Sequence, residues 1–218
     1  MFDTAVADSA VADHAVAENP DARVREFDAL FEASDDPWHF RERWYEARKR
    51  ALTVACLPHA RYASAYEPGC ANGELSAALA PRCDRLLVTD GAAAAVALAA
   101  RRLAAHAHAE VVQAWTPADW PDQRFDLIVV SELAYYLDGV ALDRLIEKLG
   151  RSLQPKGVLV ACHWRRTIEG CALSGDALHA RLADGLALPL LSSLVEADFR
   201  LDVWSADARS VGEREGLA

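Results

Sequence analysis

Residues 63–90, ASAYEPGCANGELSAALAPRCDRLLVTD, carry the pattern that decides the fold. The spacing predicts a short strand over 63–67, a glycine loop at 69–73, a helix over 74–79 and a second strand over 85–90. A strand that passes through a glycine turn and a helix into another apolar strand is typical of a βαβ unit. This stretch therefore predicts the start of an α/β fold.

The alternation of strands and helices continues along the chain. Further strands are expected over 110–114, 125–131 and 158–162, with an alanine-rich helix to about residue 105 and another helix over 142–153. Apolar strands separated by helices are typical of a parallel sheet covered on both faces. The last two strands, 191–196 and 199–205, are too close for a parallel crossover. We predict a Rossmann-like, doubly wound, mostly parallel sheet of about seven strands that ends in an antiparallel hairpin strand.

The chain before the first strand divides into two parts. Residues 1–22 hold five acids and no Lys or Arg, and a five-residue repeat over 5–18 matches neither the helix nor the strand period. We predict a disordered acidic leader there, with a transient alanine helix as the alternative. Residues 23–60 are expected to form a helical cap: one helix stops at 34–37, and a second runs from Trp38 to before Pro58. The main domain is expected over 61–207, with a polar tail over 208–218.

Composition excludes several classes of protein. The 218 residues carry a net charge of −10, which disfavours affinity based on neutralising nucleic-acid phosphates. The hydrophobic fraction is 52%, but no stretch is long and uncharged enough to predict a membrane span. The N-terminus lacks the pattern of a secretory signal, so a cytoplasmic location is expected. The five cysteines are odd in number and form no CxxC pair, so neither a disulfide framework nor a zinc site is indicated.

The glycine loop indicates which ligand the fold binds. Its glycines lie at relative positions 1 and 5, and not at the 1, 3 and 6 of a dinucleotide fingerprint, so a pyrophosphate site is disfavoured. Glu67, just before the loop, suits a cation such as the α-ammonium of an amino acid. Asp90 ends the second strand, where a carboxylate accepts the hydroxyls of a ribose. A ligand with a ribose, an ammonium and no pyrophosphate is S-adenosylmethionine.

Other cofactor contacts are expected around this edge of the sheet. Asp119 and Trp120 follow the third strand, where a carboxylate would accept the adenine amino group and an aromatic ring would cover the base. The alternative for Trp120 is ordinary packing at the rim. The remaining predicted contacts come from the loop and from the end of the fourth strand: Gly69, Cys70, Ala71, Gly73 and Ser131.

At this point the sequence resembles the class I S-adenosylmethionine-dependent methyltransferases, whose first motif is ExGxGxG, with Ala71 here in place of the middle glycine. A closer resemblance, from about Phe27 to Ser205, is to the NodS group of N-methyltransferases. It rests on these stretches: DPW at 36–38, WYEARKR at 44–50, YEPGCANGELS at 66–76, CDRLL at 83–87 and HWR at 163–165. The resemblance implies methyl transfer to the freed amine of a deacetylated chitooligosaccharide, while related proteins act on other amines.

The same resemblance implies that the cap helix covers the methionine end of the cofactor. Tyr45 and Arg48 share one face of that helix, and Arg48 would pair with the cofactor carboxylate. The alternative is that Arg48, Lys49 and Arg50 are a solvated charge run.

Catalysis requires a neutral amine and no metal, because the sulfonium donor carries its own activation. The predicted catalytic residues follow the fourth and fifth strands: Glu132, Tyr135 and His163. Glu132 has helix capping as its alternative, His163 has a hydrogen-bonded wall position, and the adjacent Tyr135 and Tyr136 cannot both face the site. The predicted substrate contacts are Trp38 and Trp164 as stacking platforms, Arg165, and His179, the last in a late helix that Asp176 is expected to cap.

Two classes of function fit these residues. The first is an amine N-methyltransferase that acts on a small-molecule or oligosaccharide amine. The second is a module that binds S-adenosylmethionine without transferring its methyl group, as a sensor or partner subunit. A nicotinamide dehydrogenase ranks third because the glycine spacing of its fingerprint is missing. The sequence does not indicate an oligomeric state.

Overall fold

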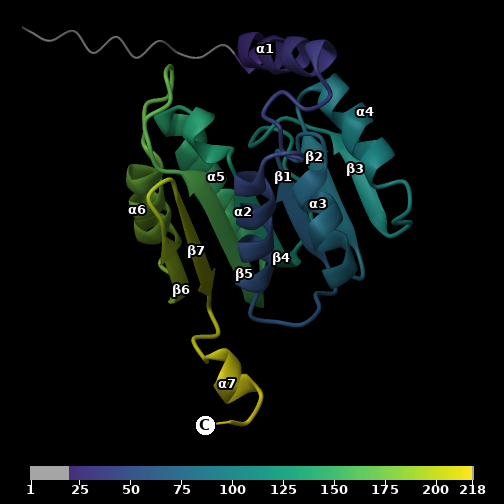
Figure 1. Cartoon of the computed structure of the whole chain (residues 1–218). Helices are drawn as coiled ribbons and strands as arrows, with labels where there is room; N and C mark the ends of the chain where they lie inside the picture. The colour runs from purple at the N-terminus through teal and green to yellow at the C-terminus, as the bar shows by residue number, and fades with distance from the viewer. Residues whose placement is uncertain (1–19, 218) are drawn as a thin grey trace, which may run out of the picture.

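The structure is a computed structural model that describes residues 20–217 (Figure 1). Most of the predicted acidic leader therefore lies outside the described residues. The leader prediction is wrong for residues 20–22, because helix α1 (Pro20–Ala33) begins there. Asp28 of this helix accepts a hydrogen bond from the backbone N–H of Ala94 at 3.0 Å, which fastens α1 to the start of a later helix.

A seven-stranded sheet forms the centre of the molecule, in the order β3-β2-β1-β4-β5-β7-β6. The strands are β1 (Ala65–Pro68), β2 (Leu86–Asp90), β3 (Ala109–Gln113), β4 (Phe125–Ser131), β5 (Leu153–Trp164), β6 (Leu190–Val195) and β7 (Phe199–Ser205). The first five strands pair in parallel, and β7 pairs antiparallel with both β5 and β6. The predicted doubly wound sheet with an antiparallel hairpin is confirmed. The antiparallel strand is inserted between β5 and β6, so β6 forms the edge.

Helices cover both faces of this sheet. The main helices after α1 are α2 (Trp44–Ala55), α3 (Glu74–Leu79), α4 (Ala93–Arg102), α5 (Gly139–Ser152) and α6 (Gly175–Leu186). Alternate residues of β4 face opposite ways: Val129 joins the core under α2, α3 and α4, and Ile128 joins the core under α5 and α6. Helix α1 lies across the end of the sheet where the parallel strands finish (Figure 1). The cap therefore covers the edge at which doubly wound folds bind ligands.

The second cap helix starts later than predicted. Residues 38–43 form turns, and α2 begins at Trp44. The cause is local, because the Asp36 carboxylate accepts the backbone N–H groups of Phe40 and Arg41 at 2.8 and 3.0 Å, and His39 has a left-handed φ of 59°. The polar tail is also partly helical, since Ser210 caps the short helix α7 (Val211–Arg214). None of the helices within residues 20–217 combines the length and apolar character needed to cross a bilayer.

Candidate active site

The loop between β1 and α3 brings backbone close to the carboxyl edge of the sheet. Gly69 and Gly73 have positive φ values of 73° and 81°. A Cβ on Gly73 would lie 3.0 Å from the Cα of Ala99, so a larger residue would push α4 away. Ala71 also adopts a left-handed φ, of 50°, although it is not glycine. The loop therefore keeps the conformation of the glycine motif at the position where the sequence departs from it.

Two carboxylates flank this loop. Asp90 ends β2 and accepts the backbone N–H groups of Ala71 and Ala92 at 2.9 and 3.0 Å. Burial raises its pKa, and these hydrogen bonds act against that rise. Glu67 in β1 is 2% exposed, and its Oε2 has no hydrogen-bond partner among the described residues. Burial raises the pKa of Glu67 to about 8. A buried carboxyl with an unpartnered oxygen is suited to a cationic ligand.

A cavity of about 570 Å³ opens above the loop and beneath the cap. Most of the predicted cofactor residues line it: Glu67, Gly69, Cys70, Ala71, Asp90 and Ser131, with Tyr45 on α2. Gly73 lies at the N-cap of α3. Four predicted catalytic or substrate residues also line the cavity: Trp38, Glu132, Tyr135 and Trp164. The structure thus brings the residues expected to bind the cofactor and those expected to meet the acceptor to one space.

One part of the cavity wall holds a group of four polar side chains, which we call the acidic cluster: Glu46, Lys49, Glu132 and Tyr135. The Lys49 ammonium donates to Glu132 Oε1 at 2.7 Å and lies 3.1 Å from Glu46 Oε2. The Tyr135 hydroxyl donates to Glu132 Oε2 at 2.5 Å. Two carboxylates and one ammonium leave this cluster with a net negative charge.

Glu132 is held in an uncommon backbone conformation. Its φ is 52°, directly after the end of β4, and its own N–H donates to the carbonyl of Cys162 at 2.9 Å. The backbone N–H of Trp164 donates to Glu132 Oε2 at 3.0 Å, so both carboxylate oxygens are fixed. Left-handed backbone in a non-glycine residue is found preferentially at functional sites.

Next to the acidic cluster, the buried hydroxyl of Tyr45 has no hydrogen-bond partner among the described residues and is available to a ligand.

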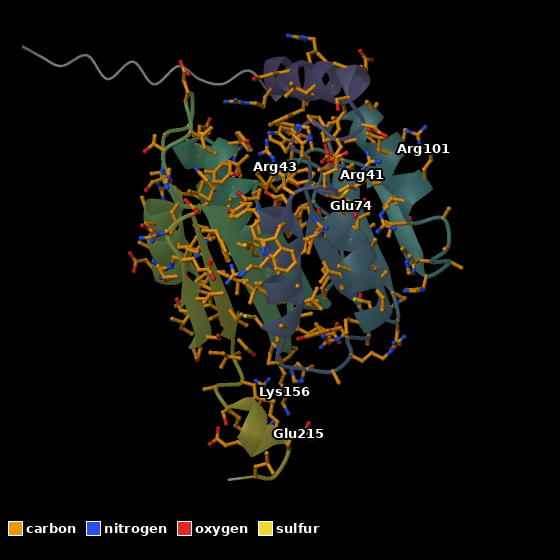
Figure 2. The ribbon with its side chains drawn as sticks, in the orientation of Figure 1. Arg41, Arg43, Glu74, Arg101, Lys156 and Glu215 are labelled. Atoms are coloured by element: carbon orange, nitrogen blue, oxygen red, sulfur yellow. The ribbon has the colours of Figure 1, made fainter. Side chains whose placement is uncertain are left out.

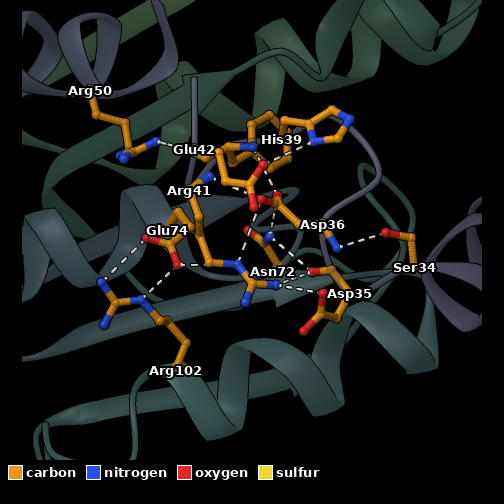
Figure 3. A network of polar contacts seen from close by, with 11 residues as sticks. Ser34, Asp35, Asp36, His39, Arg41, Glu42, Arg50, Asn72, Glu74 and Arg102 are labelled. Atoms are coloured by element: carbon orange, nitrogen blue, oxygen red, sulfur yellow. Dashed lines mark hydrogen bonds and ion pairs between the residues drawn. The ribbon is translucent and has the colours of Figure 1, made fainter. Parts of the chain in front are cut away.

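A polar network fastens the cap to the glycine loop (Figure 3). Asn72 donates to Asp36 Oδ1 at 3.0 Å and to the carbonyl of Asp35 at 3.2 Å. Glu74, which opens α3, accepts from Arg102 at 2.9 Å and lies 4.0 Å from Arg41. Figure 2 shows Arg41 and Glu74 near one another at this end of the molecule. The segment that roofs the cavity is thus hydrogen-bonded to the loop that forms its floor.

The two residues predicted to contact adenine, Asp119 and Trp120, lie away from the cavity. Asp119 accepts a hydrogen bond from the backbone N–H of Trp115, and neither Asp119 nor Trp120 lines the cavity. The Trp120 indole donates to Ser152 at 2.7 Å, which turns it toward α5. Trp115 lines the cavity instead, and its ring lies so close to Gly91 that a Cβ there would overlap it. The aromatic residue beside Asp90 is therefore Trp115.

His163 does not line the cavity, so its predicted direct proton transfer with the substrate is wrong. It is fully buried on the face of β5 toward α6, where its Nδ1 lies 3.0 Å from Nε2 of the equally buried His179. His179 Nδ1 in turn lies 2.7 Å from Asp202 Oδ2, and the backbone N–H of Ala134 donates to His163 Nε2. Burial lowers the pKa of His163 well below its usual value, so the ring stays neutral. His179, predicted to contact substrate, belongs to this buried chain.

Two predicted arginines are occupied by surface ion pairs. Arg165 pairs with Asp176 at 2.8 Å, so the expected N-cap role of Asp176 is wrong, and Ser174 caps α6. Arg48 makes two hydrogen bonds with Glu196 in the β6–β7 turn, at 2.5 and 2.7 Å, and does not line the cavity. Trp38 does line it, but its ring also packs against an aromatic group of the cap: Phe27, Phe31 and Phe40. A stacking role for Trp38 stays a prediction.

The family model described as Nodulation protein S (NodS) matches residues 18–200. The chain belongs to the NodS family. This confirms the resemblance found in the sequence, including its closer match to the NodS group than to methyltransferases in general.

Named NodS relatives cover part of this chain. Nodulation protein S of Rhizobium tropici is 37% identical over 130 residues, which are 59% of this chain and 55% of that protein. Nodulation protein S of Sinorhizobium fredii is 34% identical over 130 residues, 59% of this chain and 60% of that protein. The match thus spans little more than half the length of these NodS relatives.

Solved structures extend the comparison over more of the fold. A putative methyltransferase from Pseudomonas syringae is 55% identical, with a TM-score of 0.68 over 75% of this chain and 99% of that one. N-methyltransferase NodS from Bradyrhizobium japonicum WM9, in complex with S-adenosyl-L-homocysteine, is 23% identical, with a TM-score of 0.73 over 86% of this chain and 98% of that one. The second similarity shows the shared fold.

The sequence did not lead to Glu46, Lys49 or Trp115 as site residues of this NodS family member, although all three line the cavity. Glu46 was not singled out, Lys49 appeared only in the alternative of a solvated run with Arg48 and Arg50, and Trp120 was chosen in place of Trp115. A signal for Lys49 was present, because Tyr45, Lys49 and Thr53 recur every four residues and so share the face that packs inward. For Trp115 the sequence carried no comparable signal, since both tryptophans follow β3 in irregular chain.

Proposed function

We propose that this chain is an S-adenosylmethionine-dependent N-methyltransferase that acts on the free amine of an aminosugar, of the deacetylated chitooligosaccharide type, or on a similar small amine. The observation that carries the proposal is that a single cavity is lined by two chemically different groups of residues. At one end lie the glycine loop, Glu67 and Asp90, and at the other lies the acidic cluster. Family membership and the methyltransferase folds of the relatives support the same activity.

The residues at the first end fit the cofactor. Glu67 has a buried oxygen without a partner, which suits the α-ammonium of the methionine part. Asp90 lies at the end of β2, where its carboxylate is placed for ribose hydroxyls, and Trp115 supplies an aromatic face beside it. Apolar cap residues, among them Phe27, Phe31 and Trp38, also line this space. When bound, S-adenosylmethionine supplies an activated methyl group on a sulfonium.

The residues at the second end fit an amine. The net negative charge of the acidic cluster favours an acceptor that arrives as an ammonium ion. Glu132 is fixed by Lys49, Tyr135 and the backbone N–H of Trp164, and the lone pairs left on its carboxylate can accept an N–H of the acceptor. In this proposal Glu132 takes the proton that the amine must lose, which is the role that passes to it from the buried His163. Trp164 offers its ring as a face for a sugar or another apolar surface.

Methylation of a defined amine tests the proposal. Purified protein is incubated with S-adenosylmethionine and a panel of amines that includes D-glucosamine and a chitotetraose with a free non-reducing amine, and products are identified by mass spectrometry. We expect S-adenosylhomocysteine to form together with an acceptor that has gained one methyl group. Glu132→Gln should lower kcat by about 100-fold, and the matched surface variant Glu147→Gln should leave it unchanged.

Two results would overturn the proposal. If S-adenosylhomocysteine binds but no amine is methylated, the chain is a binding module without transfer activity. If Glu132→Gln keeps the wild-type kcat, Glu132 is not the proton acceptor.

A reducing, cytoplasmic location is part of the proposal, and it is supported by the free thiols of all five cysteines.

A further inference from the structure

Lys49 is the buried cation of the cavity. The residue is 6% exposed and lies on α2, 83 positions before Glu132, so only the packing of the cap on the sheet brings the two together. Its ammonium lies 2.7 Å from Glu132 and 5.0 Å from the centre of the Tyr45 ring. Burial acts to lower the pKa of Lys49, but the carboxylates of Glu132 and Glu46 outweigh it and raise the pKa. Lys49 therefore stays protonated at any working pH.

The groups that face Lys49 come from every element around it. They are Glu46 and Tyr45 from α2, Glu132 and Tyr135 after β4, and Cys162 from β5, while His163 lies behind them on the other face of β5. Tyr135 has its pKa raised by burial first and by Glu132 second, and the pKa of Cys162 is raised by burial, so both stay neutral. His163 stays neutral for the reason given above. Among these groups the charged ones are thus the carboxylates of Glu46 and Glu132 and the ammonium of Lys49.

These charges act on the protonated acceptor and leave the neutral amine almost unaffected. Two carboxylates alone would attract the substrate ammonium strongly and would hold it in the protonated form, which has no lone pair for attack. A fixed ammonium in the same place repels a second ammonium and leaves the neutral amine unaffected. The acidic cluster without Lys49 would therefore bind its substrate in the unreactive state.

We propose that Lys49 acts in catalysis by electrostatic repulsion, so that an acceptor bound beside Glu132 gives up its proton at a lower pH. The inference rests on the proposed amine methyltransfer and assigns to Lys49 a part in it. The acceptor R–NH₃⁺ loses one proton to Glu132, and from there to water. The lone pair freed on nitrogen would then form the N–C bond as the bond between sulfur and the methyl carbon breaks, and S-adenosylhomocysteine would leave. Lys49 exchanges no proton in this step and acts through its charge and through its hydrogen bond to Glu132.

The test measures the protonation of the bound amine directly. D-glucosamine labelled with ¹³C at C2 is bound to the protein in the presence of S-adenosyl-L-homocysteine, and its chemical shift is followed against pH. The variants are Lys49→Met, Lys49→Arg and Glu46→Gln, and the matched control is Lys156→Met, at the opposite end of the molecule (Figure 2). The acidic limb of kcat is recorded for the same proteins, and thermal melting reports their folding.

We expect the bound amine of Lys49→Met to lose its proton at a pH about one unit or more above that of wild type, with kcat falling near neutral pH and partly recovering at high pH. Glu46→Gln should move the protonation transition of the bound amine in the opposite direction, and Lys156→Met should leave it unchanged. Lys49→Arg, which keeps the positive charge, should shift it less than Lys49→Met does. Transitions that coincide in wild type, Lys49→Met and Glu46→Gln would overturn the inference. If Lys49→Met does not fold, Glu46→Gln alone decides. Absence of amine binding or methylation in wild type would instead overturn the proposed function.

Discussion

Glu67→Gln should test two properties of the proposed ammonium site. One is the stability that the protein without ligand loses when Glu67 ionises, and the other is the contribution of the carboxylate to cofactor binding. The carboxyl is buried, and its pKa of about 8 compares with an ordinary 4.5. Between these two values the folded protein holds one proton more than the unfolded chain, so the free energy of unfolding falls as pH rises. The stability present below pH 4.5 is lost progressively up to pH 8. At 1.36 kcal/mol for each pKa unit, the loss from this group is about 5 kcal/mol.

Glutamine keeps the shape of the side chain and cannot ionise. The free energy of unfolding of the ligand-free variant, measured by urea denaturation from pH 5 to pH 9, should therefore fall less steeply than that of wild type, by about 4 kcal/mol over this range. Exposed Glu147→Gln serves as the control and should keep the wild-type slope. Equal slopes for wild type and Glu67→Gln would show that Glu67 is not protonated in the empty protein.

The same variant should bind the cofactor product more weakly. A cation next to Glu67 favours its carboxylate, so binding of S-adenosylhomocysteine to wild type near pH 7 should release a proton. Calorimetry in two buffers with different ionisation enthalpies detects this release, and Glu67→Gln should lose it. The assignment of Glu67 to the ammonium site would be refuted if Glu67→Gln released as many protons as wild type on binding S-adenosylhomocysteine and was also less stable than wild type at high pH.

Three further predictions concern the same cavity. Asp90→Ala should weaken S-adenosylhomocysteine binding 100-fold or more in calorimetry, because two charge-assisted hydrogen bonds to the ribose are lost, and a change below threefold would remove Asp90 from the site. Trp115→Ala should weaken the same binding about tenfold, whereas Trp120→Phe should leave it within twofold of wild type. If Trp120→Phe weakens binding more than Trp115→Ala does in a calorimetric titration, Trp120 is the adenine contact, as the sequence predicted. His163→Ala should lower the free energy of unfolding by about 2–4 kcal/mol in denaturant titrations, because it opens a void and leaves two buried groups unpaired. Recovery of its kcat at high pH would return a proton role to His163.

The proposed cofactor end of the cavity was predictable because it depends on short stretches of chain. The end of β1, the glycine loop and the start of α3 are consecutive, so the spacing of Glu67 and the glycines already placed them at one edge of the sheet. Asp90 followed from the same rule, since parallel strands finish at one edge. The acceptor end was predictable only in part. Glu132 and Tyr135 were found beyond β4, but their partner Lys49 comes from another element.

The errors have physical causes that composition and spacing do not contain. Neighbouring residues of a strand face opposite sides, so His163 points to α6 while Trp164, one position later, reaches the cavity. Trp115 and Trp120 differ only in how the irregular chain after β3 turns, and the hydrogen bond to Ser152 draws Trp120 away. Arg48 was expected at the cofactor, but it lies one position from Lys49 on α2 and so faces Glu196.

The sequence by itself determined the α/β class, the glycine loop and the two carboxylates that flank it, because each is encoded by residues close together in the chain. The tertiary structure alone decided that β7 lies between β5 and β6, that the His163–His179–Asp202 chain is buried, and that Glu46 and Lys49 meet Glu132. These outcomes depend on how α2 and α6 pack against the sheet. Packing of distant elements is set by the fit of whole surfaces, which no local pattern of residues records.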